Sequence, residues 1–346
     1  MRRLGAALLL AALLLTACSR TPQLHQREAY VFGTRVEVSV WGESADEAAR
    51  ALAAVLAEFD RLHRMLHAWQ PSELTTLNEA IARGGQDIVV SAELAFLLKD
   101  AAGIAARSDH LFNPAIGRLV ALWGFHSDEF KPQLPDMVAV EAVVKAAPRM
   151  DDLSFAGARV SSRNATVQID LGGYAKGYAL DRAAAILRET GVGNALINIG
   201  GNVMALGDKG GQPWRVGIQH PRAPTPLATL ELRDGEAIGT SGDYQRYFEI
   251  DGRRHCHLLD PRSGRPAQGT RAVTVLIPAG AGAGTLSDAA SKPLFVAGDG
   301  WRAMAVRMGL TQALRIDGDG VMQVTAALRG RITMLAPDMK VAAEDE

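Results

Sequence analysis

A glycine-rich segment with one acidic and one basic side chain is the first candidate for chemistry. DLGGYAKG occupies residues 170–177, between an expected short strand at residues 166–170 and an expected helix at residues 174–189. Glycines let a ligand approach the backbone closely, and a helix start offers free N–H groups and a positive dipole end. With the ammonium group of Lys176 the segment suits a diphosphate. Its spacing matches neither a dinucleotide-binding nor a Walker motif, so a tight strand-to-helix turn is an equal alternative.

A second candidate gathers histidine and aspartate around an expected hairpin. GTSGDY, which contains Asp243, is followed by HLLDPRSGRP, which contains His257 and Asp260. Between them Asp251-Gly252 is typical of a two-residue hairpin turn, which would bring both segments together. Such side chains at strand ends suit proton transfer. The alternative is that Asp260, with the proline and glycine after it, only builds a turn.

A third candidate lies at the expected start of a late helix, in SDAASK at residues 287–292. Asp288 could interact with the helix dipole or offer carboxylate oxygens to a hard cation. Lys292 follows one helical turn later, so a surface ion pair with Asp288 is an equally plain interpretation.

The elements that must position these residues mix helices and strands without strict alternation. Residues 30–41 alternate and predict a strand broken near Gly33, and SADE at residues 44–47 is a capping box that opens an amphipathic helix. The other main predictions are helices at 92–107, 138–147 and 286–296, and strands at 195–199, 214–219, 227–232, 247–250 and 273–277. This order favours an α+β fold over a doubly wound sheet.

The amino terminus, MRRLGAALLLAALLLTAC, predicts a lipoprotein signal peptide. We expect residues 1–17 to be the signal, Cys18 to carry lipid, residues 18–28 to form a tether, and residues 29–340 to form a single domain. The alternative is an ordinary signal with an incidental cysteine. A diacylated cysteine anchors a protein stably, so we expect the domain to be held at a membrane outside the cytoplasm.

Net charge and cysteine content bear on two further properties, the kind of partner and disulfide bonding. The formal net charge of -1 gives no reason to expect nucleic acid as a partner. If Cys18 is lipidated, Cys256 is left without a partner for an intramolecular disulfide. A lone cysteine is more often a small buried apolar residue than a nucleophile.

Together, these segments resemble the ApbE family. The resemblance is carried in order by VFGTRVEVSV, FNPAIGRLVALWGF, DLGGYAKGYALD, INIGGNVMALG, GTSGDYQRYFEIDGRRHCHLLDPRSGRP and SDAASKPLFVAG. It implies an α+β flavin transferase that uses FAD and Mg²⁺. The implied reaction is attack of a threonine or serine hydroxyl of an acceptor protein on the FMN phosphorus, with AMP leaving. The implied location is the periplasmic side of the inner membrane, and because Ser19 follows Cys18 the outer membrane stays open as an alternative.

The resemblance also assigns residues by position. The flavin-contacting places are Phe32, Trp69, Asn113, Asp170, Lys176 and Leu259. The metal places are Gly173 through its backbone oxygen, Asp288, and Lys292, which stands where the family usually has a threonine ligand. His257 falls at the place of the histidine that serves the acceptor hydroxyl, with Asp243 and Asp260 as alternative bases.

The lysine is the main departure from the family pattern. An ammonium group has no lone pair for Mg²⁺, so either the metal has fewer protein ligands or Lys292 replaces part of its charge. Hydrolysis of FAD to FMN and AMP, and a non-catalytic FAD-binding lipoprotein, stay open as alternatives. A nicotinamide site lacks the expected glycine spacing.

Overall fold

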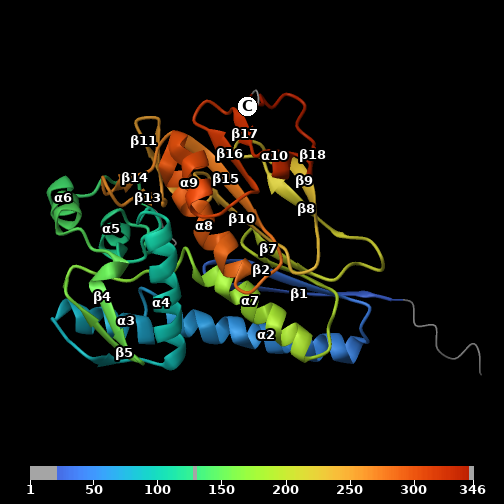
Figure 1. The fold of residues 1–346 in the computed structure, drawn as a ribbon, viewed down its shortest axis with the longest axis horizontal. Helices are drawn as coiled ribbons and strands as arrows, with labels where there is room; N and C mark the ends of the chain where they lie inside the picture. Colours follow the sequence, from blue (N-terminus) through green and yellow to red (C-terminus); the bar gives the residue numbers. More distant parts are fainter. Residues whose placement is uncertain (1–21, 128–130, 343–346) are drawn as a thin grey trace, which may run out of the picture.

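A large antiparallel sheet forms the centre of the molecule in the computed structural model, which describes residues 22–127 and 131–342. Within these residues the sheet has eight strands in the order β1-β2-β6-β7-β10-β15-β16-β17 (Figure 1). Their bounds are β1 Leu24–Val31, β2 Thr34–Trp41, β6 Ala195–Ile199, β7 Asn202–Leu206, β10 Ala237–Gly242, β15 Thr270–Ile277, β16 Ala313–Asp317 and β17 Met322–Val324. All neighbouring pairs are antiparallel.

Three helices cover one face of this sheet: α2 (Ala45–Leu66), α7 (Ala175–Glu189) and α8 (Ala283–Ala297). Helix α2 begins with the expected capping box of Ser44 and Glu47. Helices α2 and α7 lie side by side along the strands in Figure 1. The side chains between helices and sheet form the main core, because every second strand residue points to this face.

A smaller sheet covers part of the opposite face. It has the order β18-β9-β8, with β8 at Trp214–Gln219, β9 at Pro226–Leu232 and β18 at Ile332–Met334. Its apolar side chains pack on those of β7, β10, β15 and β16 in a second core cluster. The central strands are therefore buried on both faces.

The chain between α2 and α7 forms a side region of helices and strands. These are α3 (Glu73–Ala82), β3 (Ile88–Val89), α4 (Ala92–Arg107), α5 (Gly117–Leu122), α6 (Met137–Ala146), η1 (Met150–Asp152), β4 (Leu153–Ala156) and β5 (Arg159–Ser162). A third apolar cluster joins α5 and α6 to two hairpins, β11 (Tyr247–Ile250) with β12 (Arg253–Cys256), and β13 (Leu259–Asp260) with β14 (Arg265–Pro266). The carboxyl-terminal part also holds η2 (Gly298–Gly300), α9 (Trp301–Arg307) and α10 (Ala326–Arg329).

The α+β prediction is confirmed, and most predicted elements form within a few residues of their expected bounds. The predicted strand at residues 166–170 is wrong: its regular pairing is one bridge, between Gln168 and Ile116. The expected tether is also too long, since Leu24–Val31 pairs with β2 along its whole length. The predicted signal and Cys18 lie outside the described residues, and no helix in the described part is long and apolar enough to cross a membrane.

Candidate active site

The DLGGYAKG segment forms a compact turn that leads into α7. Asp170 Oδ1 accepts a hydrogen bond from the Gly172 amide at 2.7 Å. The amides of Tyr174 and Ala175 both donate to the Leu171 carbonyl oxygen. Lys176 then turns back, and its Nζ donates to the Gly172 carbonyl oxygen at 2.8 Å. The turn thus places an ammonium group beside the start of the helix.

Glycine allows α7 to approach α8 so closely that their backbones touch. A Cβ atom at Gly177 would lie 2.4 Å from the Gly284 carbonyl oxygen and 2.7 Å from Asp288 Cβ. A Cβ at Gly284 would lie 2.7 Å from the Gly177 carbonyl oxygen. Real Cβ atoms do not come this near to a backbone oxygen, so both positions need glycine.

Asp181 fixes the start of α8 against α7. Its carboxylate accepts hydrogen bonds from the Gly284 amide, the Thr285 amide and the Thr285 hydroxyl, at 2.8, 2.8 and 2.6 Å. Burial raises the pKa of Asp181, and these three bonds oppose the rise. The predicted site residues did not include Gly177 and Gly284 at the helix contact, nor Asp181. The signal that could have found Asp181 is its spacing, since it lies one helical turn after Gly177 and so on the same face.

The close crossing delivers Asp288 into a buried, positively charged surrounding. Its side chain is 0% exposed. Oδ2 accepts from the Gly177 amide at 3.1 Å and lies 3.7 Å from Lys176 Nζ, whereas Oδ1 accepts from Lys292 Nζ. Burial disfavours the charged carboxylate, but the two ammonium groups and the hydrogen bonds outweigh it and lower the pKa of Asp288 to about 2. Asp288 is therefore ionised at neutral pH.

Lys292 occupies the space between Asp288 and Gly173. A Cβ on Gly173 would lie 3.0 Å from Lys292 Cε and 3.4 Å from Lys292 Cδ. The ammonium group also donates to the Asp288 carbonyl oxygen at 2.7 Å. Burial lowers the pKa of Lys292 to about 8, while the charge of Asp288 opposes the fall, so the ammonium form prevails at neutral pH.

The residues expected to hold a metal thus lie together, but they do not fit a divalent cation. Both Asp288 oxygens already accept hydrogen bonds, and two ammonium groups stand where a cation would be repelled. The described residues contain no group of three or more His, Cys, Asp or Glu side chains that could hold a metal ion. The donors that Mg²⁺ prefers are several oxygens, and the side chains of this cluster offer one carboxylate, which is already engaged.

His257 is held in one tautomer by the backbone of Arg246, in the bend that precedes β11. Its Nδ1 lies 3.1 Å from the Arg246 carbonyl oxygen, and its own amide donates to the same oxygen at 3.0 Å. A carbonyl only accepts, so Nδ1 carries the proton and Nε2 carries a lone pair. Within the part of the chain that the structure describes, Nε2 has no hydrogen-bond partner. Burial, with the charges of Arg246, Lys176 and Lys292, lowers the pKa of His257 to about 3.

The two alternative bases are both engaged by arginine. Arg222 binds Asp243 through two hydrogen bonds of 2.7 and 2.6 Å. Arg262 binds Asp260 in the same way, with Nε and one terminal nitrogen at 2.9 and 2.8 Å. Paired bonds of this kind are strong and fix the carboxylate on its arginine partner. The geometry therefore favours His257 over either aspartate.

The apolar residues expected to contact flavin lie on two separate clusters. Phe32 sits in the β1–β2 turn with a φ of 57°, and its ring packs on Phe59 at 6.2 Å. Trp69 is half-buried against the main core, with its ring 5.5 Å from that of exposed His126. Leu259 belongs instead to the cluster of α5, α6 and the hairpins. In the described residues no hydrogen bond or ring contact joins these three to one another.

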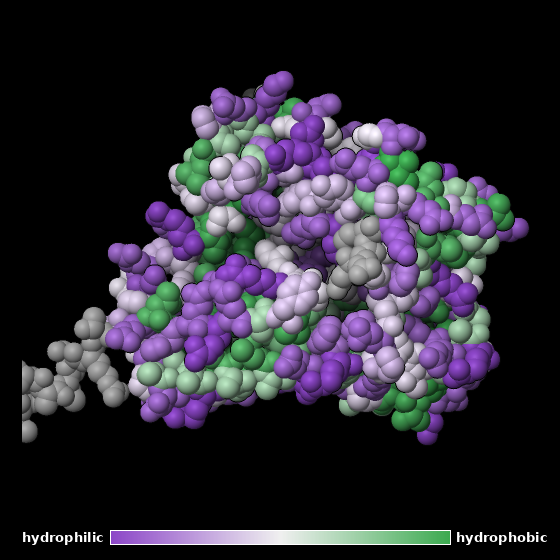
Figure 2. Space-filling view, turned by 180° about the vertical axis from the view of Figure 1, so that it is seen from behind, coloured by the Kyte–Doolittle hydropathy of each residue, from purple (hydrophilic) through white to green (hydrophobic). Residues whose placement is uncertain are grey.

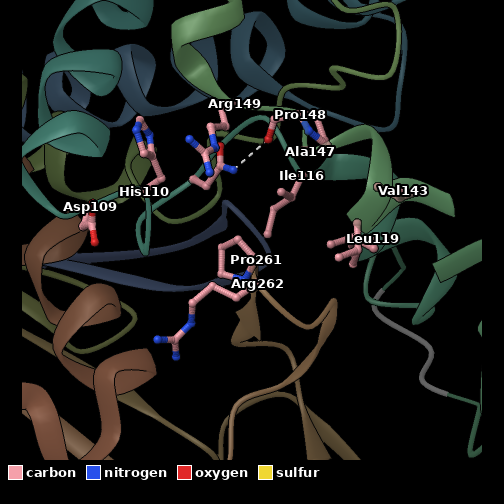
Figure 3. Close-up of a pocket in the computed structure, with 12 residues that line it drawn as sticks. Asp109, His110, Ile116, Leu119, Val143, Ala147, Pro148, Arg149, Pro261 and Arg262 are labelled. Atoms are coloured by element: carbon pink, nitrogen blue, oxygen red, sulfur yellow. Dashed lines mark hydrogen bonds between the residues drawn. The ribbon is translucent and has the colours of Figure 1, made fainter. Parts of the chain in front are cut away.

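Asn113 lines a cavity of about 260 Å³ between the side region and the β13–β14 hairpin (Figure 3). Its side chain donates to the Pro148 carbonyl oxygen at 2.9 Å and accepts from the Ala115 amide at 3.1 Å. Pro261 and Arg262 of the hairpin form another wall. Asn113 therefore shapes this cavity, while its amide is already used in holding the loop.

Seen from behind, the surface is hollowed near its centre and hydrophilic residues dominate the rim (Figure 2).

Cys256 is not available at the surface, since it is 1% exposed and burial raises the pKa of its thiol to about 12. The structure brings Gly173, Lys176, Asp288 and Lys292 into direct contact, and the charges of both lysines contribute to lowering the pKa of His257.

Known proteins match this sequence over most of its length. The ApbE family model matches residues 32–314. A FAD:protein FMN transferase of Rhodobacter capsulatus is 44% identical over 88% of this chain, and the chain spans only 57% of its length. One from Klebsiella pneumoniae is 30% identical over 97% of this chain and 96% of its own.

Solved structures also share the fold of this chain. An ApbE protein from Thermotoga maritima has a TM-score of 0.80 at 31% identity, covering 89% of this chain and 99% of its own. The flavinyl transferase ApbE of Pseudomonas stutzeri, in its apo form, has a TM-score of 0.77 at 29% identity, covering 90% and 97%. On the sequence match and the shared fold together, the chain belongs to the ApbE family.

Proposed function

We propose that this protein is a flavin transferase that cleaves FAD and attaches FMN to a threonine or serine hydroxyl of another protein. Family membership and the names of the relatives support transfer of FMN from FAD to protein. The observation that carries the proposal in this chain is His257: its Nε2 has no hydrogen-bond partner among the described residues, and burial with the charges of Arg246, Lys176 and Lys292 lowers its pKa.

The reaction divides among the residues as follows. Nε2 of His257 takes the proton of the acceptor hydroxyl while the hydroxyl oxygen forms a bond to the FMN phosphorus. The bond from that phosphorus to the bridging oxygen breaks, and the bridging oxygen leaves on AMP. In phosphoryl transfer most of the catalysis is positioning and neutralisation of charge, which Lys176 and Lys292 can supply to the diphosphate.

The test uses the detergent-solubilised full-length protein with FAD and a candidate acceptor protein. We expect flavin fluorescence on the denatured acceptor and one AMP released per flavin attached. His257→Ala should lower transfer by about 10²–10⁴-fold, because a positioned base contributes that much, while FAD binding remains. Free FMN with AMP would instead indicate a hydrolase, and intact bound FAD a binding protein.

We also propose that the protein is lipid-anchored through Cys18 and works at the periplasmic side of the inner membrane. Support comes from the two arginines, the apolar run and the LTAC ending of the first eighteen residues. The acceptor would then be a protein that exposes a threonine or serine at the same membrane face.

A further inference from the structure

Three charged side chains form one unit at the α7–α8 crossing, where Lys176 and Lys292 both contact Asp288. We call the two lysines of this unit the lysine pair. The carboxylate is 0% exposed, whereas the side chains of Lys176 and Lys292 are 23% and 16% exposed. The solvent-accessible part of the unit is therefore cationic. One carboxylate against two ammonium groups leaves one positive charge uncompensated within it.

The lysine pair is held by the fold and does not depend on the ligand for its shape. Lys176 is tied to the Gly172 carbonyl oxygen, and Lys292 to the Asp288 carbonyl oxygen, at 2.8 and 2.7 Å. Gly173 gives room for the Lys292 stem, since a Cβ there would press on it at 3.0 Å. Each ammonium has three donors, so both keep a hydrogen for an anion.

An uncompensated positive charge with spare donors, beside a helix start, suits phosphate oxygens. It is the opposite of what a divalent cation needs, because a cation inserted here would have to displace an ammonium group from Asp288, the carboxylate of this unit. In the cluster where the family resemblance places a metal ion, the positive charge therefore comes from Lys176 and Lys292.

Resting on the proposed function, we propose that the lysine pair binds the diphosphate of FAD directly, with Lys292 taking over the charge that a bound metal ion would otherwise supply. FAD binding by this protein does not require a divalent cation. Lys292 also sets the metal requirement, so a single substitution can convert the site to one that depends on metal.

The experiment measures FAD binding to the metal-stripped full-length protein by equilibrium dialysis, in EDTA and in excess Mg²⁺. Wild type should bind equally in both. Lys292→Thr removes the ammonium and adds a hydroxyl ligand, so it should bind about 10–100-fold more weakly in EDTA and regain affinity in Mg²⁺. Lys209→Thr removes the same charge from an exposed loop lysine, 5.7 Å from the Trp41 ring, and should behave as wild type.

Metal binding gives a readout that needs no variant. Mn²⁺ titrated into wild type and followed by electron paramagnetic resonance should stay free, with or without FAD. Stoichiometric Mn²⁺ binding by wild type, or a tenfold loss of its FAD affinity in EDTA, overturns the inference and leaves the proposed transferase intact. Absence of FAD binding under every condition overturns the proposed function itself.

Discussion

The contact between α7 and α8 offers a direct test of how the site is built, through Gly177→Ala. A methyl group there would meet the Gly284 carbonyl oxygen at 2.4 Å and Thr285 Cα at 2.8 Å. Both are backbone atoms and cannot turn aside, so the helices must separate. Inserting a methyl group into a packed contact costs about 1–3 kcal/mol. Alanine in a helix regains about 0.5–1 kcal/mol over glycine, so a net loss of roughly 0–2.5 kcal/mol remains.

A matched glycine in another helix isolates the effect of the contact. A Cβ at Gly103 in α4 would meet only the Arg107 guanidinium at 3.7 Å. Gly103→Ala should therefore stabilise the protein by about 0.5–1 kcal/mol. Between the two variants the difference in unfolding free energy should be about 1–3 kcal/mol, since the helix term cancels.

Urea denaturation followed by circular dichroism gives the unfolding free energies of both variants and wild type. FAD binding is measured in parallel, because separation of the helices would also lengthen the 3.1 Å bond from the Gly177 amide to Asp288. The reasoning is refuted if Gly177→Ala is as stable as Gly103→Ala and binds FAD as wild type does.

Two further predictions concern other parts of the chain. Because burial lowers the pKa of His257 to about 3, the imidazole keeps its neutral, proton-accepting form down to that pH, and the transfer rate should not fall between pH 7 and pH 5 through this group. A rate profile with a midpoint near the ordinary histidine value of about 6.5 would contradict the assignment. Cys18→Ala should leave the precursor unprocessed or release the protein from membranes in fractionation, and a variant that fractionates and migrates as wild type would disprove the anchor.

Local signals predicted the local structure well. The Ser44–Glu47 capping box opens α2, and Asp251-Gly252 forms the tight turn between β11 and β12, with Ile250 paired to Arg253. Both depend on contacts within a few residues, which the sequence specifies directly. The prediction of a strand at residues 166–170 was wrong because this apolar segment has no neighbouring strand to pair with, apart from one bridge between Gln168 and Ile116.

Residue types also indicated the candidate site, but not how its charges are compensated. Asp243, His257 and Asp260 were equal candidates for the base by type. Arg222 and Arg262 decide among them by occupying the two carboxylates, and Arg246 fixes the histidine tautomer through its backbone oxygen. Arg222 pairs with a residue twenty-one positions away, and no local pattern predicts such a partner.

By itself the sequence determined the family, the α+β composition and the residues around which the site would form, because motifs and periodicity are properties of neighbouring residues. It left Asp288 and Lys292 as either a surface ion pair or a metal site. The tertiary structure decided that the ion pair is buried and not on the surface, since Gly177 and Gly284 let two helices that are distant in sequence touch and bury the carboxylate completely. A buried charge is costly unless it is paired, which is why both lysines converge on Asp288. The burial of Asp288 comes from packing between segments that are far apart in the chain, and the sequence pattern around it does not specify that packing.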